Sequence, residues 1–201
     1  MNRFSEKIKQ LGGRFHSDET GAVIGITLGH AQVTDFSLNL LMDNNDAKYV
    51  SYLSLAGTSV SDAGLAFLKC LPNLEELSMN ETGITGIGFD KQNCTCLKKL
   101  SLRDCRSISE AGLSKLANVT TIESLTLSGA NINDSSLVQI ARLSNLRELR
   151  LDRTSVSDVG LNELLGISEL RRLSVRNTNV SSKGIELLEQ ALPNLSLGLI
   201  M

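Results

Sequence analysis

The sequence predicts an α/β solenoid: a right-handed, curved horseshoe segment with a parallel sheet on its concave face and short helices on its convex face. The first observation is a phrase, L-x-x-L-x-L followed by T-x-(V/I)-(S/T)-D-x-G-L, that recurs from Val50 onward about every 24 residues. The second is apolar and polar alternation in the first half of the phrase, and the third is helical spacing in its second half. Repeats of this kind bury a core only by stacking on one another, so we expect a single elongated domain.

The domain is expected to have three parts. Residues 1–21 form an N-terminal cap of one helix and one strand, because Phe4, Ile8 and Leu11 have helical spacing and Gly12-Gly13 ends the pattern. Residues 22–194 contain seven repeats, and residues 195–201 form an apolar terminal strand. The repeats begin at Val23, Val50, Leu74, Leu97, Ile122, Leu146 and Leu170, with a truncated one at Leu195.

The leucine phrase of each repeat is expected to be a strand with one buried face. In the fifth repeat, for example, Leu125 and Leu127 flank Thr126. Because successive side chains of a strand point to opposite faces, the two leucines point inward and Thr126 points to the concave surface. The third, fifth and seventh positions of every repeat are therefore expected on the concave face.

The second half of each repeat carries the start of a helix. Six small polar residues are expected to be helix N-caps: Ser61, Thr85, Ser109, Asn133, Ser157 and Ser181. Asp62, Asp134 and Asp158 follow, where a carboxylate interacts favourably with the N-terminal end of the helix dipole.

Glycines recur two positions later, and we expect them to let the helix approach the sheet: Gly64, Gly88, Gly112, Gly160 and Gly184. The third repeat differs, since Gln92 stands where a leucine is expected. Its helix should be short or irregular, with Cys94 filling the missing apolar position.

The repeat T-x-V-(S/T)-D-x-G-L-x-x-L resembles leucine-rich repeats of bacterial proteins, notably those of planctomycetes. The opening Leu11-Gly12-Gly13 and the close Ala191-Leu192-Pro193-Asn194 also look like that group. The repeat is similar as well to the cysteine-containing repeats of F-box proteins, although Cys105 alone occupies the repeat cysteine position. The resemblance implies a curved parallel sheet with a protein-binding concave face.

Composition and charge exclude several classes of function. A formal charge of −2 and a pI near 5.7 argue against nucleic acid or a membrane surface as partner. Only His16 and His30 are present, far from the pair Cys94-x-Cys96, and no catalytic motif occurs. We therefore expect a non-enzyme without cofactor or metal. Residues 1–11 are polar without an apolar stretch, and cysteines are few, so we expect reduced thiols and a cytoplasmic location.

The concave positions supply the candidate binding residues: Tyr52, Glu76, Lys99, Arg103, Arg150, Arg172 and Arg176. Residues of one column in successive strands are lateral neighbours, which predicts three ion pairs: Glu76 with Lys99, Glu148 with Arg172, and Asp152 with Arg176. Tyr52, Arg103 and Arg150 are then left without a lateral partner, and Tyr and Arg are common interface anchors.

The sequence thus predicts a non-catalytic protein-protein interaction scaffold whose concave sheet face binds a mildly acidic protein. A first alternative is self-association through the apolar C-terminal edge, because an uncovered strand edge invites pairing. A second alternative, implied by the F-box resemblance, is a substrate-recognition module of a ubiquitin-ligase-type complex. The oligomeric state is left open.

Overall fold

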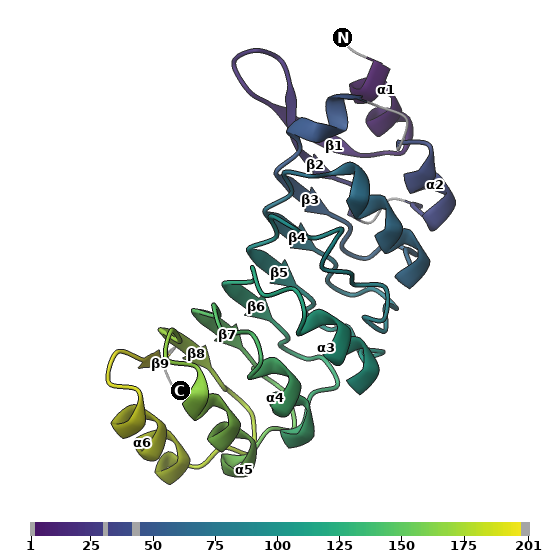
Figure 1. Ribbon diagram of the computed structural model, residues 1–201. Helices are drawn as coiled ribbons and strands as arrows, with labels where there is room; N and C mark the ends of the chain where they lie inside the picture. The colour runs from purple at the N-terminus through teal and green to yellow at the C-terminus, as the bar shows by residue number, and fades with distance from the viewer. Residues whose placement is uncertain (1–2, 30–31, 42–44, 198–201) are drawn as a thin grey trace.

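The computed structural model describes residues 3–29, 32–41 and 45–197. One sheet of nine strands runs the length of the molecule in chain order (Figure 1). The strands are β1 (Arg14–Ser17), β2 (Val23–Thr27), β3 (Tyr52–Ser54), β4 (Glu76–Ser78), β5 (Lys99–Ser101), β6 (Ser124–Thr126), β7 (Glu148–Arg150), β8 (Arg172–Ser174) and β9 (Ser196–Leu197). The helices are α1 (Arg3–Gln10), α2 (Asp35–Asn39), η1 (Asn45–Tyr49), η2 (Asp62–Cys70), α3 (Glu110–Leu116), α4 (Asp134–Ile140), α5 (Asp158–Leu161), η3 (Asn162–Gly166) and α6 (Ser182–Ala191).

The stack is curved, with the sheet on the concave side. Figure 1 shows the helices fanned along the outer side of the arc and the strands packed closely along the inner side. The cause is a difference in width, since paired strands lie about 4.8 Å apart whereas packed helices need about 8 to 10 Å. The predicted α/β solenoid with a mostly parallel sheet and short outer helices is confirmed.

The N-terminal end differs from the rest of the sheet. Strand β1 runs antiparallel to β2, whereas all later neighbours are parallel. The turn between them is closed by Asp18, whose carboxylate accepts hydrogen bonds from the backbone N–H groups of Thr20 and Ala22. Phe4 and Ile8 of α1 are fully buried, so the helix covers the end of the core. The division of the chain into cap, repeats and terminal strand stays a prediction.

The inward columns agree with the sequence pattern. The fourth-position leucines are at most 2% exposed and lie beside one another in successive strands: Leu53, Leu77, Leu100, Leu125, Leu149 and Leu173. The polar residues between them face outward, because the side chains of a strand alternate.

Five of the six predicted N-caps are confirmed. The side chains of Ser61, Ser109, Asn133, Ser157 and Ser181 each accept a hydrogen bond from a backbone N–H of the following helical turn. Thr85 is the exception, because no helix follows it.

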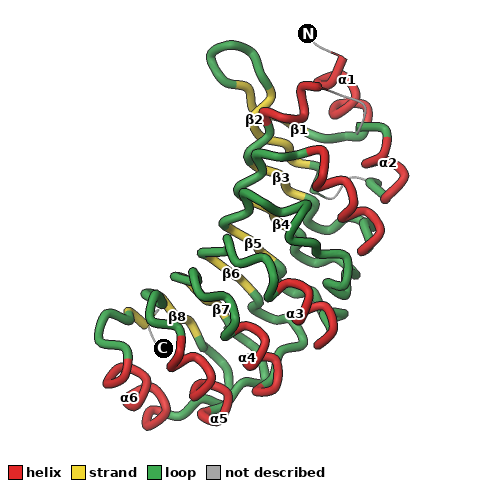
Figure 2. Tube along the Cα trace, viewed as in Figure 1, coloured by secondary structure: helices red, strands yellow, loops and turns green. Residues whose placement is uncertain are grey.

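The third repeat has no helix between β4 and β5, which goes further than the predicted irregularity. Figure 2 shows this stretch as loop, between the helical layers formed by η2 and α3. Phe89 and Cys94 are nonetheless buried, so Cys94 fills an apolar position as expected. Burial raises the pKa of the Cys94 thiol to about 11, so it stays protonated and behaves as a small apolar group.

The helix-start aspartates do more than interact with the dipole of their own helix. The carboxylate of Asp134 accepts hydrogen bonds from both the N–H and the hydroxyl of Ser157, the N-cap of the next repeat, each at 2.7 Å. The same pair of bonds joins Asp35 to Ser61, Asp62 to Thr85, and Asp158 to Ser181. We name these contacts the carboxylate ladder. They connect the four helix starts at these aspartates to the repeat that follows each of them.

The expected role of the glycines that recur in the repeats is wrong. A Cβ on Gly64, Gly160 or Gly184 would collide with the ladder aspartate of the preceding repeat, not with the sheet. At Gly88 and Gly112 the collision would be with the backbone carbonyl of Asp62 or Thr85. These glycines therefore set the distance between neighbouring repeats.

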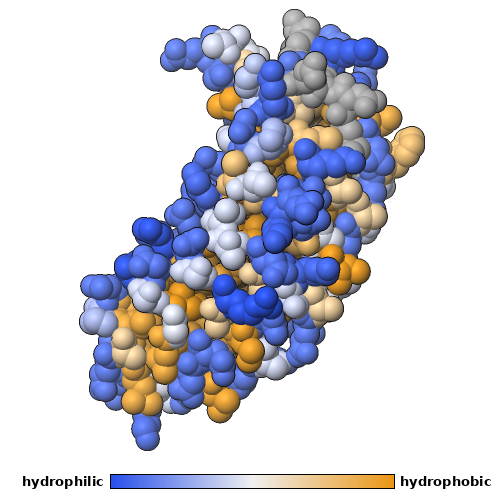
Figure 3. All heavy atoms as spheres, viewed as in Figure 1, coloured by the Kyte–Doolittle hydropathy of each residue, from blue (hydrophilic) through white to orange (hydrophobic). Residues whose placement is uncertain are grey.

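At the C-terminal end, β9 contains only Ser196 and Leu197, paired with β8. Exposed apolar side chains occur nearby on the convex side, at Val159, Leu165 and Leu187. Figure 3 shows hydrophobic residues gathered over these C-terminal repeats. The rest of the predicted terminal strand, residues 198–201, lies outside the described residues, as does His30. Self-association through this edge stays a prediction.

Gly160→Ala is expected to destabilise the protein by about 1 to 3 kcal/mol, because the new methyl group would displace the Asp134 carboxylate from Ser157. Alanine normally stabilises a helix relative to glycine, so a loss of stability in Gly160→Ala would have to come from the collision. Gly166→Ala is the matched control, since a Cβ there meets nothing within 4 Å. Urea unfolding of both variants measures the difference. Equal stability of the two variants would show that the glycine is not a spacing requirement.

The pH dependence of stability in the variant Asp62→Asn tests whether the charged Asp62 carboxylate stabilises the carboxylate ladder. Burial alone would raise the pKa of Asp62, but hydrogen bonds from Thr85, Gly88 and Gly86 outweigh burial and hold its pKa below the usual value. A carboxylate with a lowered folded pKa stabilises the protein above its unfolded pKa, and that contribution disappears as pH falls through the folded pKa. We expect the free energy of unfolding of the wild type to be about 1 kcal/mol higher than that of the variant at neutral pH.

The difference between wild type and Asp62→Asn should shrink below about pH 4. Urea titrations at a series of pH values measure it. A difference that stays constant through the acid range would contradict a charged, hydrogen-bonded Asp62.

Candidate functional site

The concave face is built from three columns of outward side chains. Strand pairing aligns the third-position residues as neighbours in the order Gly25, Tyr52, Glu76, Lys99, Ser124, Glu148, Arg172 and Ser196. The fifth-position column contains small hydroxyl residues from Thr27 to Thr126 and then Arg150. The lateral order that the sequence predicts is therefore confirmed. The seventh position follows each strand and includes Arg103, Asp152 and Arg176.

The middle of the face carries the first predicted ion pair. Lys99 Nζ lies within hydrogen-bond distance of Glu76 Oε1, and both side chains are largely exposed. Beside them runs a shallow groove of about 250 Å³ lined by Tyr52, Ser101 and Thr126 among others. An exposed pair of this kind contributes at most about 1 kcal/mol to stability. Glu76 and Lys99 remain accessible to a partner.

Glu148 holds two arginines. Its Oε2 accepts from Arg172 Nη2 at 3.0 Å, as the lateral pairing predicts. Its Oε1 accepts from Arg150 Nε at 2.9 Å, a contact within one strand that the lateral argument missed. Burial alone would raise the pKa of Glu148, but the adjacent guanidinium groups of Arg150 and Arg172 hold its pKa below the ordinary value. The prediction that Arg150 lacks a partner is wrong.

The predicted ion pair between Asp152 and Arg176 is also wrong. Asp152 Oδ1 accepts from the Ser174 hydroxyl and, at 2.8 Å, from the backbone N–H of Arg176. The carboxylate thus joins two successive turns of the chain, and the Arg176 side chain is not part of the contact. Asn80 makes the corresponding contacts with the Ser101 hydroxyl and the Arg103 backbone N–H.

Arg103 and Arg176 are the concave arginines whose guanidinium groups lack a partner in the part of the chain that the structure describes. Both side chains are exposed. Arg153, by contrast, reaches across Gly129 to Asp104 at 3.3 Å. Arg103 therefore keeps the free side chain that the sequence predicts, and Arg176 takes the place expected for Arg150.

Tyr52 has an unforeseen neighbour. Strand pairing places His16 of β1 opposite Gly25, which also pairs with Tyr52. A Cβ on Gly25 would lie 3.6 Å from both the His16 and the Tyr52 ring, so the two rings flank the glycine. The antiparallel pairing of β1 produces this arrangement, which the repeat pattern alone does not reveal.

A second concave cavity lies at the C-terminal end of the face. A cavity of about 250 Å³ is lined by polar and charged groups over β7 and β8: Glu148, Arg150, Asp152, Arg172, Ser174, Arg176 and Ser196, with Leu149 and Leu173 at its base. We name it the arginine pocket. It brings together three of the seven candidate residues, whereas Tyr52, Glu76 and Lys99 line the central groove. Arg103 follows β5 and lines neither cavity.

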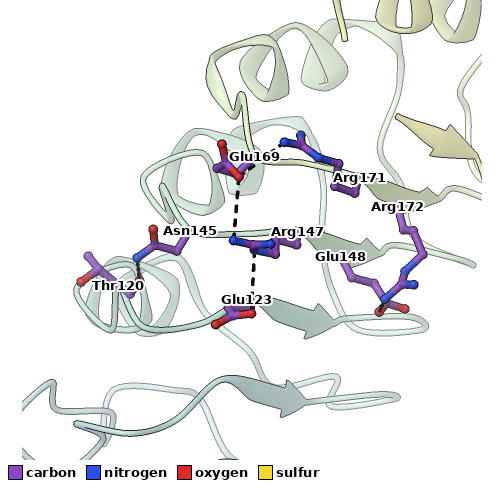
Figure 4. Close-up of polar contacts among 8 residues, drawn as sticks. All are labelled: Thr120, Glu123, Asn145, Arg147, Glu148, Glu169, Arg171 and Arg172. Atoms are coloured by element: carbon purple, nitrogen blue, oxygen red, sulfur yellow. Dashed lines mark hydrogen bonds and ion pairs between the residues drawn. The ribbon is translucent and has the colours of Figure 1, made fainter. Parts of the chain in front are cut away.

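A row of charges that the sequence analysis missed lies along the rim where the strands begin. Figure 4 shows Arg147 between Glu123 and Glu169, with Arg171 also directed to Glu169. Glu75 and Lys98 continue the row. Second-position residues, which come just before each strand, supply most of this row, and their charges would have revealed it. The side chains are mutually paired and exposed, so we assign them to the surface and not to the site.

Within the described ranges, no three His, Cys, Asp or Glu side chains come together as a metal-binding group. Among the helices of that same part of the chain, none has the length and apolar character needed to cross a membrane.

Comparison with known proteins supports a leucine-rich repeat fold. A leucine-rich repeat family model matches residues 93–117. The crystal structure of an internalin C2 from Listeria monocytogenes superposes with a TM-score of 0.68, at 19% sequence identity, over 96% of this chain and 80% of that one. No curated protein sequence matches the chain. At this identity the likeness shows the fold, which is a leucine-rich repeat solenoid.

Proposed function

We propose that this chain is a non-catalytic scaffold that binds a protein partner on its concave sheet face. Leucine-rich repeat domains generally serve protein interaction, and the fold is typically non-catalytic. The observation that carries the proposal is the pair of exposed guanidinium groups of Arg103 and Arg176, which have no partner among the described residues. The other charges of this face are held by internal contacts.

The size and chemistry of the face support this assignment. Seven parallel strands span about 30 Å, enough for a standard interface. Arg and Tyr side chains frequently dominate the energy of such interfaces. We propose further that the repeats are of the bacterial type and that the protein is cytoplasmic, as the sequence indicates. The proposed partner is a mildly acidic protein.

Photo-crosslinking at single positions tests which face binds. A photoreactive phenylalanine analogue replaces Thr126 on the concave face or Val138 on the convex helix α4 of the same repeat; both side chains are accessible and neither makes a side-chain hydrogen bond in the described structure. We expect the Thr126 position to crosslink to a defined host protein and the Val138 position to give no such product.

Mass spectrometry of the purified adducts identifies the partner. A product obtained from Val138 alone would contradict a concave binding face. A product from neither position, with the folded protein confirmed by circular dichroism, would contradict the scaffold proposal itself.

A further inference from the structure

We propose that the arginine pocket binds the carboxylate group of an acidic side chain in an extended segment of the partner. The inference rests on the proposed function and names the chemistry that one part of the concave face recognises. It concerns the cavity over β7 and β8, apart from the central groove around Tyr52.

The pocket holds two guanidinium groups in fixed positions. Glu148 is only 16% exposed and accepts from Arg150 on one oxygen and from Arg172 on the other. An arginine has five N–H donors, so each guanidinium retains donors that have no partner within the described residues. Because Glu148 orders both side chains in advance, an incoming anion does not bear the full entropic cost of fixing them.

The acidic groups of the pocket are already occupied. Asp152 uses its oxygens for Ser174, the Arg176 backbone and, at 3.4 Å, Ser128. The Arg176 guanidinium has no such contact in the described structure. Three arginines against two carboxylates leave a net positive charge in a cavity of about 250 Å³. Electrostatics therefore favours an anion here.

The internal carboxylate indicates the kind of anion. Glu148 shows that a planar carboxylate fits between the guanidinium groups of this pocket. Guanidinium and carboxylate groups form parallel hydrogen bonds, which gives directional recognition.

The surroundings indicate an extended segment. Arg103 follows β5 and Arg176 follows β8, so three strand steps, about 14 Å, separate the two free arginines. Four residues of extended chain cover about 13 Å. An acidic residue in the arginine pocket would thus place a second acidic residue, four positions away, near Arg103.

Fluorescence anisotropy with labelled hexaglutamate tests the pocket directly, with hexaglutamine as the uncharged probe. We expect hexaglutamate to bind, and the affinity to fall with rising salt because the contact is between exposed charges. Hexaglutamine should not bind. Absence of hexaglutamate binding at low salt would overturn the proposal.

Arg176→Gln locates the binding without breaking an ion pair of the described structure. We expect this change to weaken hexaglutamate binding about tenfold. Lys91→Gln removes the same charge from an exposed loop on the other side of the molecule and should leave the affinity unchanged. Equal effects of the two changes would show non-specific attraction and overturn the proposal. The double variant Arg150→Gln/Arg172→Gln should bind even more weakly than Arg176→Gln.

A phosphoserine-containing peptide of otherwise neutral sequence distinguishes carboxylate from phosphate. Binding of that peptide in an Arg176-dependent manner, with no binding of hexaglutamate, would overturn the carboxylate assignment in favour of a phosphate site. A Thr126 crosslink to a partner without hexaglutamate binding would remove this inference and leave the proposed function standing. Hexaglutamate binding without a Thr126 crosslink would show that the pocket binds carboxylates but would contradict a protein partner on the concave face, and with it the assignment of the carboxylate to that partner.

Discussion

Each repeat of this chain can bury its leucines only against the repeats on either side, so the stacking register determines every other feature of the molecule. One leucine column at most 2% exposed runs from Leu53 to Leu173 through six successive strands. Because side chains alternate along a strand, fixing this column inward fixes the concave columns outward. A slip of one residue would exchange the two faces. The binding face is therefore a direct consequence of the core.

The carboxylate ladder is the polar counterpart of that core. Asp134 reaches forward to the cap of the next helix, and Gly160 leaves the space that its carboxylate occupies. The aspartate and the glycine of the repeat phrase thus work as a pair across the boundary between repeats. In the third repeat the helix is missing, and a backbone carbonyl of Thr85 accepts from Ser109 instead, so the stack continues without a break.

The sequence was sufficient for the fold and for the columns, because both follow from periodicity. It also predicted the helix caps, since a small polar residue before a helical pattern has one common role. It could not show which way a side chain turns. The ladder aspartates could serve their own helix or the next one at the same spacing, and only the structure shows that they join both.

The ion pairs illustrate the same limit. Glu148 could pair with Arg172 across the sheet or with Arg150 two residues along its own strand, and it does both. Asp152 was expected to pair with the Arg176 guanidinium, but its carboxylate accepts a hydrogen bond from the backbone N–H of Arg176 instead. The lateral order of residues therefore predicts which residues are neighbours, but not whether a carboxylate binds the neighbour's side chain or its backbone N–H.

Some residues build the stack and others are placed to bind a partner, and a paired measurement on two variants tests that separation most directly. Unfolding free energy in urea and affinity for hexaglutamate are measured for Asp134→Asn and for Arg176→Gln. We predict that Asp134→Asn lowers stability by about 1 kcal/mol and keeps the affinity, whereas Arg176→Gln keeps stability and lowers the affinity. Loss of both properties in both variants would contradict a separation of stacking residues from binding residues.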